Sequence, residues 1–254
     1  MNDTVPPSRA AILLVQLGTP DKPEVPEVRR YLREFLTDRR VVEQSPLIWW
    51  PILYSVVLTR RPKESAEKYR SIWTKAGSPL LVNTKLAAEA LQDELNKRGR
   101  QVEVVWAMRY GDPSMVDALR DLRDRGFSRI VVLPMYPQYS AATSGTVFDV
   151  IAREFLQWRS IPALRFLQSF HDDPGYIAAV AESIRHFWRQ SEAGKPEKLI
   201  FSFHGLPQRC VDQGDPYVKQ CQESAALIAA ALGLATPERV ALLEEKIRER
   251  DALI

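Results

Sequence analysis

The chain has few of the residues that build redox and metal sites. Its 254 residues include only two cysteines, Cys210 and Cys221, and three histidines. The cysteine spacing matches no zinc pattern, and the polar N-terminus lacks the apolar segment of an export signal. We therefore expect free, reduced thiols in an intracellular, cytoplasmic protein.

Charge of one sign and phosphate-binding loops are also scarce. The formal net charge is only +3, and basic residues cluster no further than the pairs Arg29-Arg30, Arg39-Arg40 and Arg60-Arg61. This balance gives no reason to expect a nucleic-acid partner. Neither glycine-rich nucleotide fingerprint, GxGxxG or GxxxxGK[ST], occurs, so no nucleotide cofactor is expected.

Long hydrophobic runs are absent, and the longest apolar stretch lies within residues 45–62. Its run from Pro46 to Leu58 is interrupted by Pro51 and is shorter than the ~20 residues that span a bilayer. Rings followed by cations are typical of an interfacial lip; these residues are Trp49, Trp50, Tyr54, Arg60 and Arg61. The same pattern fits a buried core helix, or an apolar rim whose arginines pair with a ligand's carboxylates.

Short apolar runs alternate with amphipathic stretches along the rest of the chain. The expected strands are residues 10–18, 101–111, 129–140, 162–170 and 198–205. The expected helices are residues 82–98, 112–126, 143–158 and 173–188. The second and fourth are expected to start at an Asp-Pro pair, with Asp112 or Asp173 as the cap. The expected apolar faces are Leu86, Ala90, Leu91 and Leu95 in the first helix, and Met115, Leu119 and Leu122 in the second. This alternation predicts an α/β fold with mainly parallel sheets flanked by helices, since parallel strands need crossovers of this length.

We predict two Rossmann-like α/β units. The first covers residues 1–150 and carries the apolar lip, and the second covers residues 151–254. The helix at 143–158 is expected to connect them. A charged helical tail at 237–254, with apolar residues at Val240, Leu243 and Ile247, is expected to end the chain.

Chemistry-bearing residues follow four of the predicted strands, where ligands of parallel sheets bind. They are Gly18-Thr19-Pro20, Arg109-Tyr110-Gly111, the segment from Tyr136 to Ser140, and His204-Gly205-Leu206-Pro207. His204 fits either a structural hydrogen bond or a role as metal ligand or proton shuttle. The Tyr136 segment fits turn and cap chemistry, or the wall of a pocket for a flat, conjugated ligand with carboxylates.

Six stretches carry a resemblance to a known family. They are "LLVQLGTP" (13–20), "RRP…SAEKYRSIW…GSPL" (60–80), "MRYGDPS" (108–114), "LPMYPQYSAATSG" (133–145), "FSFHGLPQR" (201–209) and "GDPYVKQCQESAALIA" (214–229). In this order and spacing the chain resembles the ferrochelatases of bacteria, lyases that insert Fe²⁺ into a porphyrin in haem synthesis. The resemblance covers roughly residues 10–235 and implies two class II chelatase units.

The resemblance also implies roles for individual residues. His204 looks like the histidine of the family's S-x-H-x-L-P motif, an iron ligand or proton acceptor that faces the porphyrin centre, and Ser202 is retained with it. Leu17 stands where some relatives have tyrosine or methionine. The implied porphyrin-binding residues are Arg61, Tyr69, Ser78, Arg109, Tyr110, Tyr136, Tyr139 and Ser140.

The resemblance fails after "LGLATPER" (232–239), where the family continues with an acidic cluster whose glutamate works opposite the histidine. Glu244 and Glu245 echo that cluster, but we interpret them as a solvated helix face. We therefore expect a member that is either C-terminally truncated or a natural short variant, with an incomplete second unit and no partner glutamate.

Three functions follow as expectations: Fe²⁺ insertion into a porphyrin, with protoporphyrin IX favoured; a non-catalytic porphyrin-binding module; or a chelatase for cobalt or another tetrapyrrole. The implied partners are porphyrin and ferrous iron, the latter as substrate, with no other cofactor. Peripheral contact with the inner face of a membrane through residues 46–61 is a further expectation.

Overall fold

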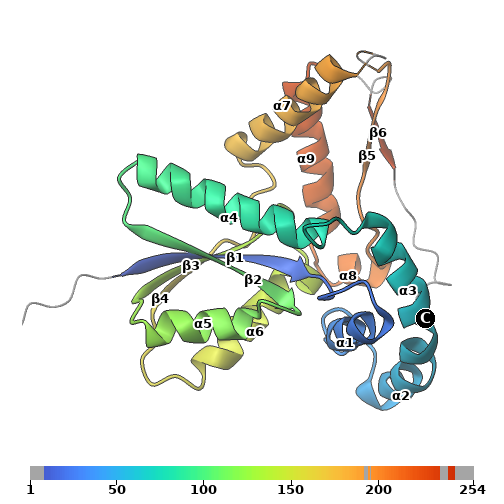
Figure 1. Cartoon of the computed structure of the whole chain (residues 1–254). Helices are drawn as coiled ribbons and strands as arrows, with labels where there is room; N and C mark the ends of the chain where they lie inside the picture. Colours follow the sequence, from blue (N-terminus) through green and yellow to red (C-terminus); the bar gives the residue numbers. More distant parts are fainter. Residues whose placement is uncertain (1–8, 192–193, 195, 235–239, 244–254) are drawn as a thin grey trace, which may run out of the picture. The chain divides into compact units, whose positions relative to one another are not determined.

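The computed structural model describes residues 9–191, 194 and 196–234, and the backbone of residues 240–243. The chain divides into two compact units, whose elements are labelled in Figure 1. Unit 1 comprises residues 1–135 and 141–168, and unit 2 comprises residues 136–140 and 169–254. This division differs from the predicted boundary after residue 150, which falls inside a helix of unit 1 (Thr146–Phe155).

Unit 1 is built around a four-stranded parallel sheet. The strands are β1 (Ala10–Gly18), β2 (Val102–Tyr110), β3 (Arg129–Pro134) and β4 (Ala163–Phe166), in the order β2-β1-β3-β4. The central strand β1 is a nearly continuous apolar run, as expected for a strand covered on both faces. Leu13 pairs with Val105 on one side and Val132 on the other, and Leu13 is fully buried. The predicted α/β fold with a parallel sheet is confirmed.

Helices lie on both faces of this sheet (Figure 1). One face is covered by α4 (Pro79–Lys97), and the other by α5 (Met115–Asp124) and α6 (Thr146–Phe155). The apolar face predicted for the 112–126 helix is confirmed, because Met115, Leu119 and Leu122 are all buried. The face predicted for the 82–98 helix is wrong. Thr84 and Ala88 are its buried residues, whereas Leu86 is 55% exposed.

Two further sequence expectations change within unit 1. The cap of α5 is Ser114, whose hydroxyl accepts from the backbone N–H of Val116 and Asp117, and not Asp112 as the Asp-Pro pair suggested. The predicted connector at 143–158 consists of a short π-helix, η2 (Ala141–Gly145), followed by α6. Because α6 packs on α5 and leads into β4, this segment is part of unit 1 rather than a link between units.

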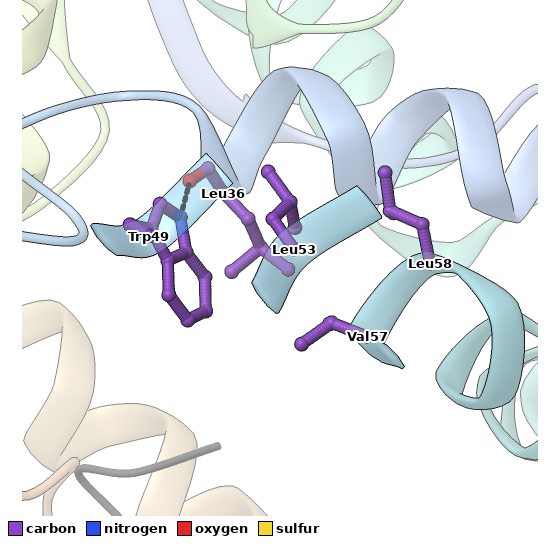
Figure 2. Close-up of a cluster of buried hydrophobic side chains, with 5 residues drawn as sticks. All are labelled: Leu36, Trp49, Leu53, Val57 and Leu58. Carbon is purple, nitrogen blue, oxygen red and sulfur yellow. Dashed lines mark hydrogen bonds between the residues drawn. The ribbon is translucent and has the colours of Figure 1, made fainter. Parts of the chain in front are cut away.

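The remaining helices of unit 1 contain the predicted lip. They are α1 (Val25–Leu36), α2 (Pro46–Ile52), the π-helix η1 (Leu53–Val57) and α3 (Leu58–Ile72). Figure 2 shows their buried cluster, formed by Leu36, Trp49, Leu53, Val57 and Leu58. Within it the indole N–H of Trp49 donates to the carbonyl of Leu36 at 2.7 Å, so the ring's one polar atom is satisfied.

Unit 2 is smaller. It contains α7 (Pro174–Gln190), β5 (Leu199–Ser202), α8 (Gln208–Asp212), α9 (Tyr217–Ala231) and β6 (Val240–Leu243). Its core joins α7 to α9 through Ile177, Ala181, Ile228, Leu232 and Leu234. Asp173 caps α7 by accepting from the N–H of Tyr176, and Pro174 occupies the first turn, as the sequence predicts.

The helical tail predicted for residues 237–254 is wrong at its start. Residues Val240–Leu243 form β6, which pairs in parallel with β5. A run of four apolar residues is compatible with a strand as well as with a helix, and periodicity alone does not distinguish them. Glu244 and Glu245 lie outside the described residues.

Candidate functional site

The ends of β1 and β2 lie close together at the carboxyl edge of the sheet in unit 1. Gly18 has a φ of +118°, and a Cβ built there would lie 1.8 Å from the carbonyl oxygen of Tyr110. Glycine is therefore required for this approach. Just beyond it, the buried hydroxyl of Thr19 donates to the hydroxyl of Ser78 at 2.9 Å. Ser78, predicted at the pocket rim, is thus buried and engaged at the start of α4.

Arg109 and Tyr110 are held by a buried carboxylate. The Arg109 guanidinium forms an ion pair with Asp38, and the Tyr110 hydroxyl donates to the same Asp38 oxygen at 2.9 Å. Arg109 also lies over the Tyr110 ring, 4.2 Å from its centroid, and donates to the carbonyl of Thr146. Burial raises the pKa of Tyr110 well above its usual range.

The pair is largely enclosed. The Tyr110 side chain is fully enclosed, and the Arg109 side chain is only 9% exposed. In this structure both residues bond to Asp38 and stabilise the strand end, and their contact with a porphyrin stays a prediction. Asp38, which holds them, follows α1 in a loop and carries no motif that would have marked it in the sequence.

A small polar cavity of about 170 Å³ opens beside these strand ends. Its walls include Thr19, Glu34 and Gly111. The Glu34 carboxylate accepts from the N–H of Gly111 at 2.9 Å, and burial raises the pKa of Glu34. Ligand pockets for drug-sized molecules measure roughly 300–1,000 Å³, so this cavity is too small for a porphyrin.

Arg61 and Tyr69 lie on α3, next to the lip. Arg61 is exposed and has no hydrogen-bond or ion-pair partner within the described part of the chain. Tyr69 is half-buried, and its ring contacts Tyr31 and Trp73 edge-on, with centroids 6.3 Å apart in each pair. Burial raises the pKa of Tyr69. Arg61 is therefore a cation available to an external carboxylate.

The lip is amphipathic, with one face in the cluster of Figure 2 and the other exposed. Leu47 is 88% exposed, and Trp50 and Tyr54 are each about half exposed. The other exposed apolar members are Ile48, Ile52 and Val56. The core-helix and lip interpretations therefore each describe one face of the segment. Among the described residues, no helix is long and apolar enough to cross a membrane.

The segment Tyr136–Ser140, which we call the wall loop, belongs to unit 2, although the residues before and after it belong to unit 1. Tyr136 and Tyr139 are half-buried, and Ser140 is buried. The loop is bonded to the residues around α9: the Ser140 hydroxyl donates to Asp215 at 3.0 Å, and the Tyr139 N–H donates to the side chain of Gln220 at 2.7 Å. The sequence did not mark these two partners.

His204 is exposed in the loop that follows β5 in unit 2. Its Nδ1 lies 2.6 Å from the carbonyl oxygen of Gly205. Because a carbonyl oxygen can only accept, Nδ1 carries a proton, and in that tautomer the lone pair of the ring lies at Nε2. Nε2 has no hydrogen-bond partner among the residues described here. It is therefore free to accept a proton or to donate its lone pair to a metal ion.

The predicted site residues thus divide between the units. Unit 1 holds Arg61, Tyr69, Ser78, Arg109 and Tyr110, and unit 2 holds Tyr136, Tyr139, Ser140 and His204. Over the described ranges, no group of three or more His, Cys, Asp or Glu side chains is arranged to hold a metal ion. The candidate groups are therefore an unengaged arginine on α3 in unit 1, and an exposed imidazole and an anchored aromatic loop in unit 2.

Comparison with known proteins identifies the family. A family model of ferrochelatase matches residues 9–242. The chain belongs to the ferrochelatase family. The matched region includes every residue that the sequence pointed to as a site member.

Individual relatives agree with this assignment. A ferrochelatase of Aromatoleum aromaticum is 50% identical over 234 residues, which are 92% of this chain and 63% of that protein. One of Azoarcus sp. is 51% identical over 233 residues, with the same two shares. One of Methylococcus capsulatus is 52% identical over 231 residues, 91% of this chain and 69% of that protein. The chain thus spans 63% of the length of the first two relatives.

Proposed function

We propose that this chain inserts Fe²⁺ into a porphyrin, with protoporphyrin IX as the favoured substrate. The observation that carries the proposal is the exposed imidazole of His204, with its lone pair at Nε2, in a chain about half identical to curated ferrochelatases. Ferrous iron and porphyrin are both substrates. The proposal needs no nucleotide and no other cofactor.

The reaction requires the exchange of two protons for one metal ion. A porphyrin carries two central N–H groups, and Fe²⁺ enters as both protons leave, so the product is neutral at its centre and no electron is transferred. Nε2 of neutral His204 accepts one of these protons, which makes the imidazole positively charged. The second proton passes to solvent. Protonated His204 returns its proton to solvent before the next cycle.

Porphyrin binding is assigned to Arg61 on α3 and to the two tyrosines of the wall loop. The guanidinium of Arg61 pairs with a propionate, which its exposure and lack of a partner among the described residues support. Tyr136 and Tyr139 of the wall loop offer half-buried aromatic surface to the macrocycle. Binding at the periphery supplies the free energy to bend the ring and expose its nitrogen lone pairs.

The exposed face of the lip supports peripheral contact with the inner face of a membrane. Leu47, Trp50 and Tyr54 place apolar and aromatic surface next to the cations Arg60 and Arg61. Sedimentation with vesicles of phosphatidylglycerol and phosphatidylcholine tests this contact. Leu47→Glu is expected to abolish co-sedimentation, and vesicle binding equal to that of the unchanged chain would count against it.

Metal insertion by the purified chain tests the main proposal. Zn²⁺, Fe²⁺ and Co²⁺ are each supplied with protoporphyrin IX, and the change in the visible bands is followed against a blank without protein. Insertion of Zn²⁺ and Fe²⁺ above the blank supports the proposal. Porphyrin binding with insertion at the blank rate indicates a porphyrin-binding module, and insertion of Co²⁺ alone indicates a different chelatase.

A further inference from the structure

The wall loop is fixed by an unusually regular set of hydrogen bonds within unit 2. Four consecutive residues each contribute at least one bond, starting with the carbonyl of Pro137, which accepts from the N–H of Phe170 at 2.9 Å. The side-chain amide of Gln138 donates to the hydroxyl of Ser224 at 2.9 Å. Tyr139 and Ser140 bond to Gln220 and Asp215, as described above.

Three of these four partners come from one short stretch, and their spacing explains why they act together. Gln220 and Ser224 are separated by four residues on α9, so they lie on the same face of the helix. Asp215 precedes the helix and uses its other oxygen to accept from the N–H of Tyr217 at 3.0 Å. The carboxylate thus orders the start of α9 and fixes Ser140 at the same time.

Ser224 is the most enclosed member of the set. It is fully buried, and its hydroxyl donates to the carbonyl of His171 at 2.8 Å. Since a hydroxyl has a single proton, its oxygen must accept from Gln138, which fixes the orientation of that amide. His171 is itself held, because its Nε2 lies 2.8 Å from a Glu223 oxygen.

We propose that Asp215, Gln220 and Ser224 are positioning residues that hold the wall loop, and with it Tyr136 and Tyr139, in the conformation that receives the porphyrin. The inference rests on the proposed function, because it gives the tyrosines their ligand. The bond from the Tyr139 N–H to Gln220 acts on the backbone of one of these tyrosines directly. The three residues act through the loop, without touching porphyrin or metal.

Gln220 offers the sharpest test, because the same helix provides a matched control. Gln220→Met removes the acceptor for the Tyr139 N–H while keeping a side chain of similar length, and Gln220→Glu restores an acceptor. Gln222 is exposed on the same helix, so Gln222→Met makes the same chemical change away from the loop. Ser224→Ala is a second variant, compared with Ser183→Ala, an exposed serine on α7.

Two readouts are measured on each variant: the hydrogen-exchange rate of the Tyr139 amide, and the affinity for protoporphyrin IX from its Soret shift. One neutral hydrogen bond contributes about 0.5–1.5 kcal/mol, which corresponds to roughly a two- to tenfold change in an equilibrium. Gln220→Met is therefore expected to speed Tyr139 exchange and to weaken porphyrin binding, each by about two- to tenfold. Gln220→Glu and Gln222→Met are expected to behave like the unchanged chain.

The outcomes separate this inference from the proposed function. Equal Tyr139 exchange in Gln220→Met and Gln222→Met overturns the inference, as does faster exchange with unchanged porphyrin affinity. If the unchanged chain produces no Soret shift, the proposed function fails, and the anchors have no porphyrin wall to position. Weaker binding that Gln220→Glu does not rescue shows that the effect does not pass through the acceptor, and it also overturns the inference.

Discussion

Removing the Asp38 carboxylate should be among the most damaging single changes in unit 1. Asp38→Ala takes away the ion-pair partner of Arg109 and the acceptor of the Tyr110 hydroxyl. Arg109 keeps its bond to the carbonyl of Thr146, at 3.1 Å, but its guanidinium stays largely enclosed. The same substitution also removes the acceptor for the N–H of Arg40.

The size of the effect follows from the burial of these groups. The side chains of Arg109 and Asp38 are 9% and 11% exposed. Breaking a buried pair by removing one partner costs about 3–5 kcal/mol. A buried hydroxyl left without its acceptor separately costs about 1–3 kcal/mol. Because both charges retain a little solvent contact, we expect a loss near the lower limit, about 3 kcal/mol. Asp38→Asn keeps an acceptor for Tyr110 and should cost less.

Urea unfolding followed by far-UV circular dichroism measures the loss. Glu94→Ala is the control, because Glu94 pairs with Arg98 at a surface where the two side chains are 49% and 69% exposed. Solvent screens an exposed pair of this kind, so it contributes little to stability. If Asp38→Ala and Glu94→Ala lower the free energy of unfolding equally, the structural role assigned to the Asp38 carboxylate is wrong.

Three further predictions test the lip, the Glu34 carboxylate and the thiols. Leu53→Ala should lower the free energy of unfolding by about 2–5 kcal/mol, because Leu53 is fully buried. Leu47→Ala, on the exposed face of the lip, should change it by less than about 0.5 kcal/mol. Equal losses of the two variants in urea unfolding would contradict a lip with one buried and one exposed face. Burial raises the pKa of Glu34, so on raising the pH the unfolded chain ionises first and stability falls. Glu34→Gln should therefore be more stable than the unchanged chain at pH 7 but not at pH 4, and a gain independent of pH would refute this cause. Burial raises the pKa of Cys221 to about 11, so iodoacetamide at pH 8 should label the half-buried Cys210 first. Labelling is followed by mass spectrometry. Faster labelling of Cys221 than of Cys210 would contradict the burial of Cys221.

The sheet of unit 1 could be predicted from the sequence because its strands are apolar runs bounded by helices. Which face of each helix is buried depends on the side chains through which the helix packs against the sheet, and this could be predicted for only one of the two helices below. Met115, Leu119 and Leu122 are buried as their periodicity indicates, but the buried residues of α4 are the small Thr84 and Ala88. A leucine can stay exposed on a helix that contacts a sheet closely through small residues. The sequence pattern does not show whether the leucines or the small residues of such a helix face the sheet.

Only part of the candidate site could be predicted from the sequence. His204 could be placed at a strand end, because an apolar run is followed by glycine and proline there. The partners that hold the site residues could not, since Asp38 meets Arg109 across 71 positions of sequence and Gln220 meets Tyr139 across 81. The spacing of Val240, Leu243 and Ile247 predicts a helix where β6 forms. The run of four apolar residues in β6 has no period of its own to oppose that prediction, and the pairing of β6 with β5 joins residues far apart in the sequence.

The most direct test of the central claim is the turnover number for Zn²⁺ insertion into protoporphyrin IX by His204→Gln and His186→Gln. His186 is an exposed histidine on α7, so the two variants make the same substitution at a proposed proton acceptor and at a control position. General-base catalysis contributes typically about 10²–10⁴-fold, so His204→Gln should lose at least about a hundredfold in turnover while porphyrin affinity stays close to that of His186→Gln. Equal turnover by the two variants would contradict the role of His204, and with it the account of how this chain works.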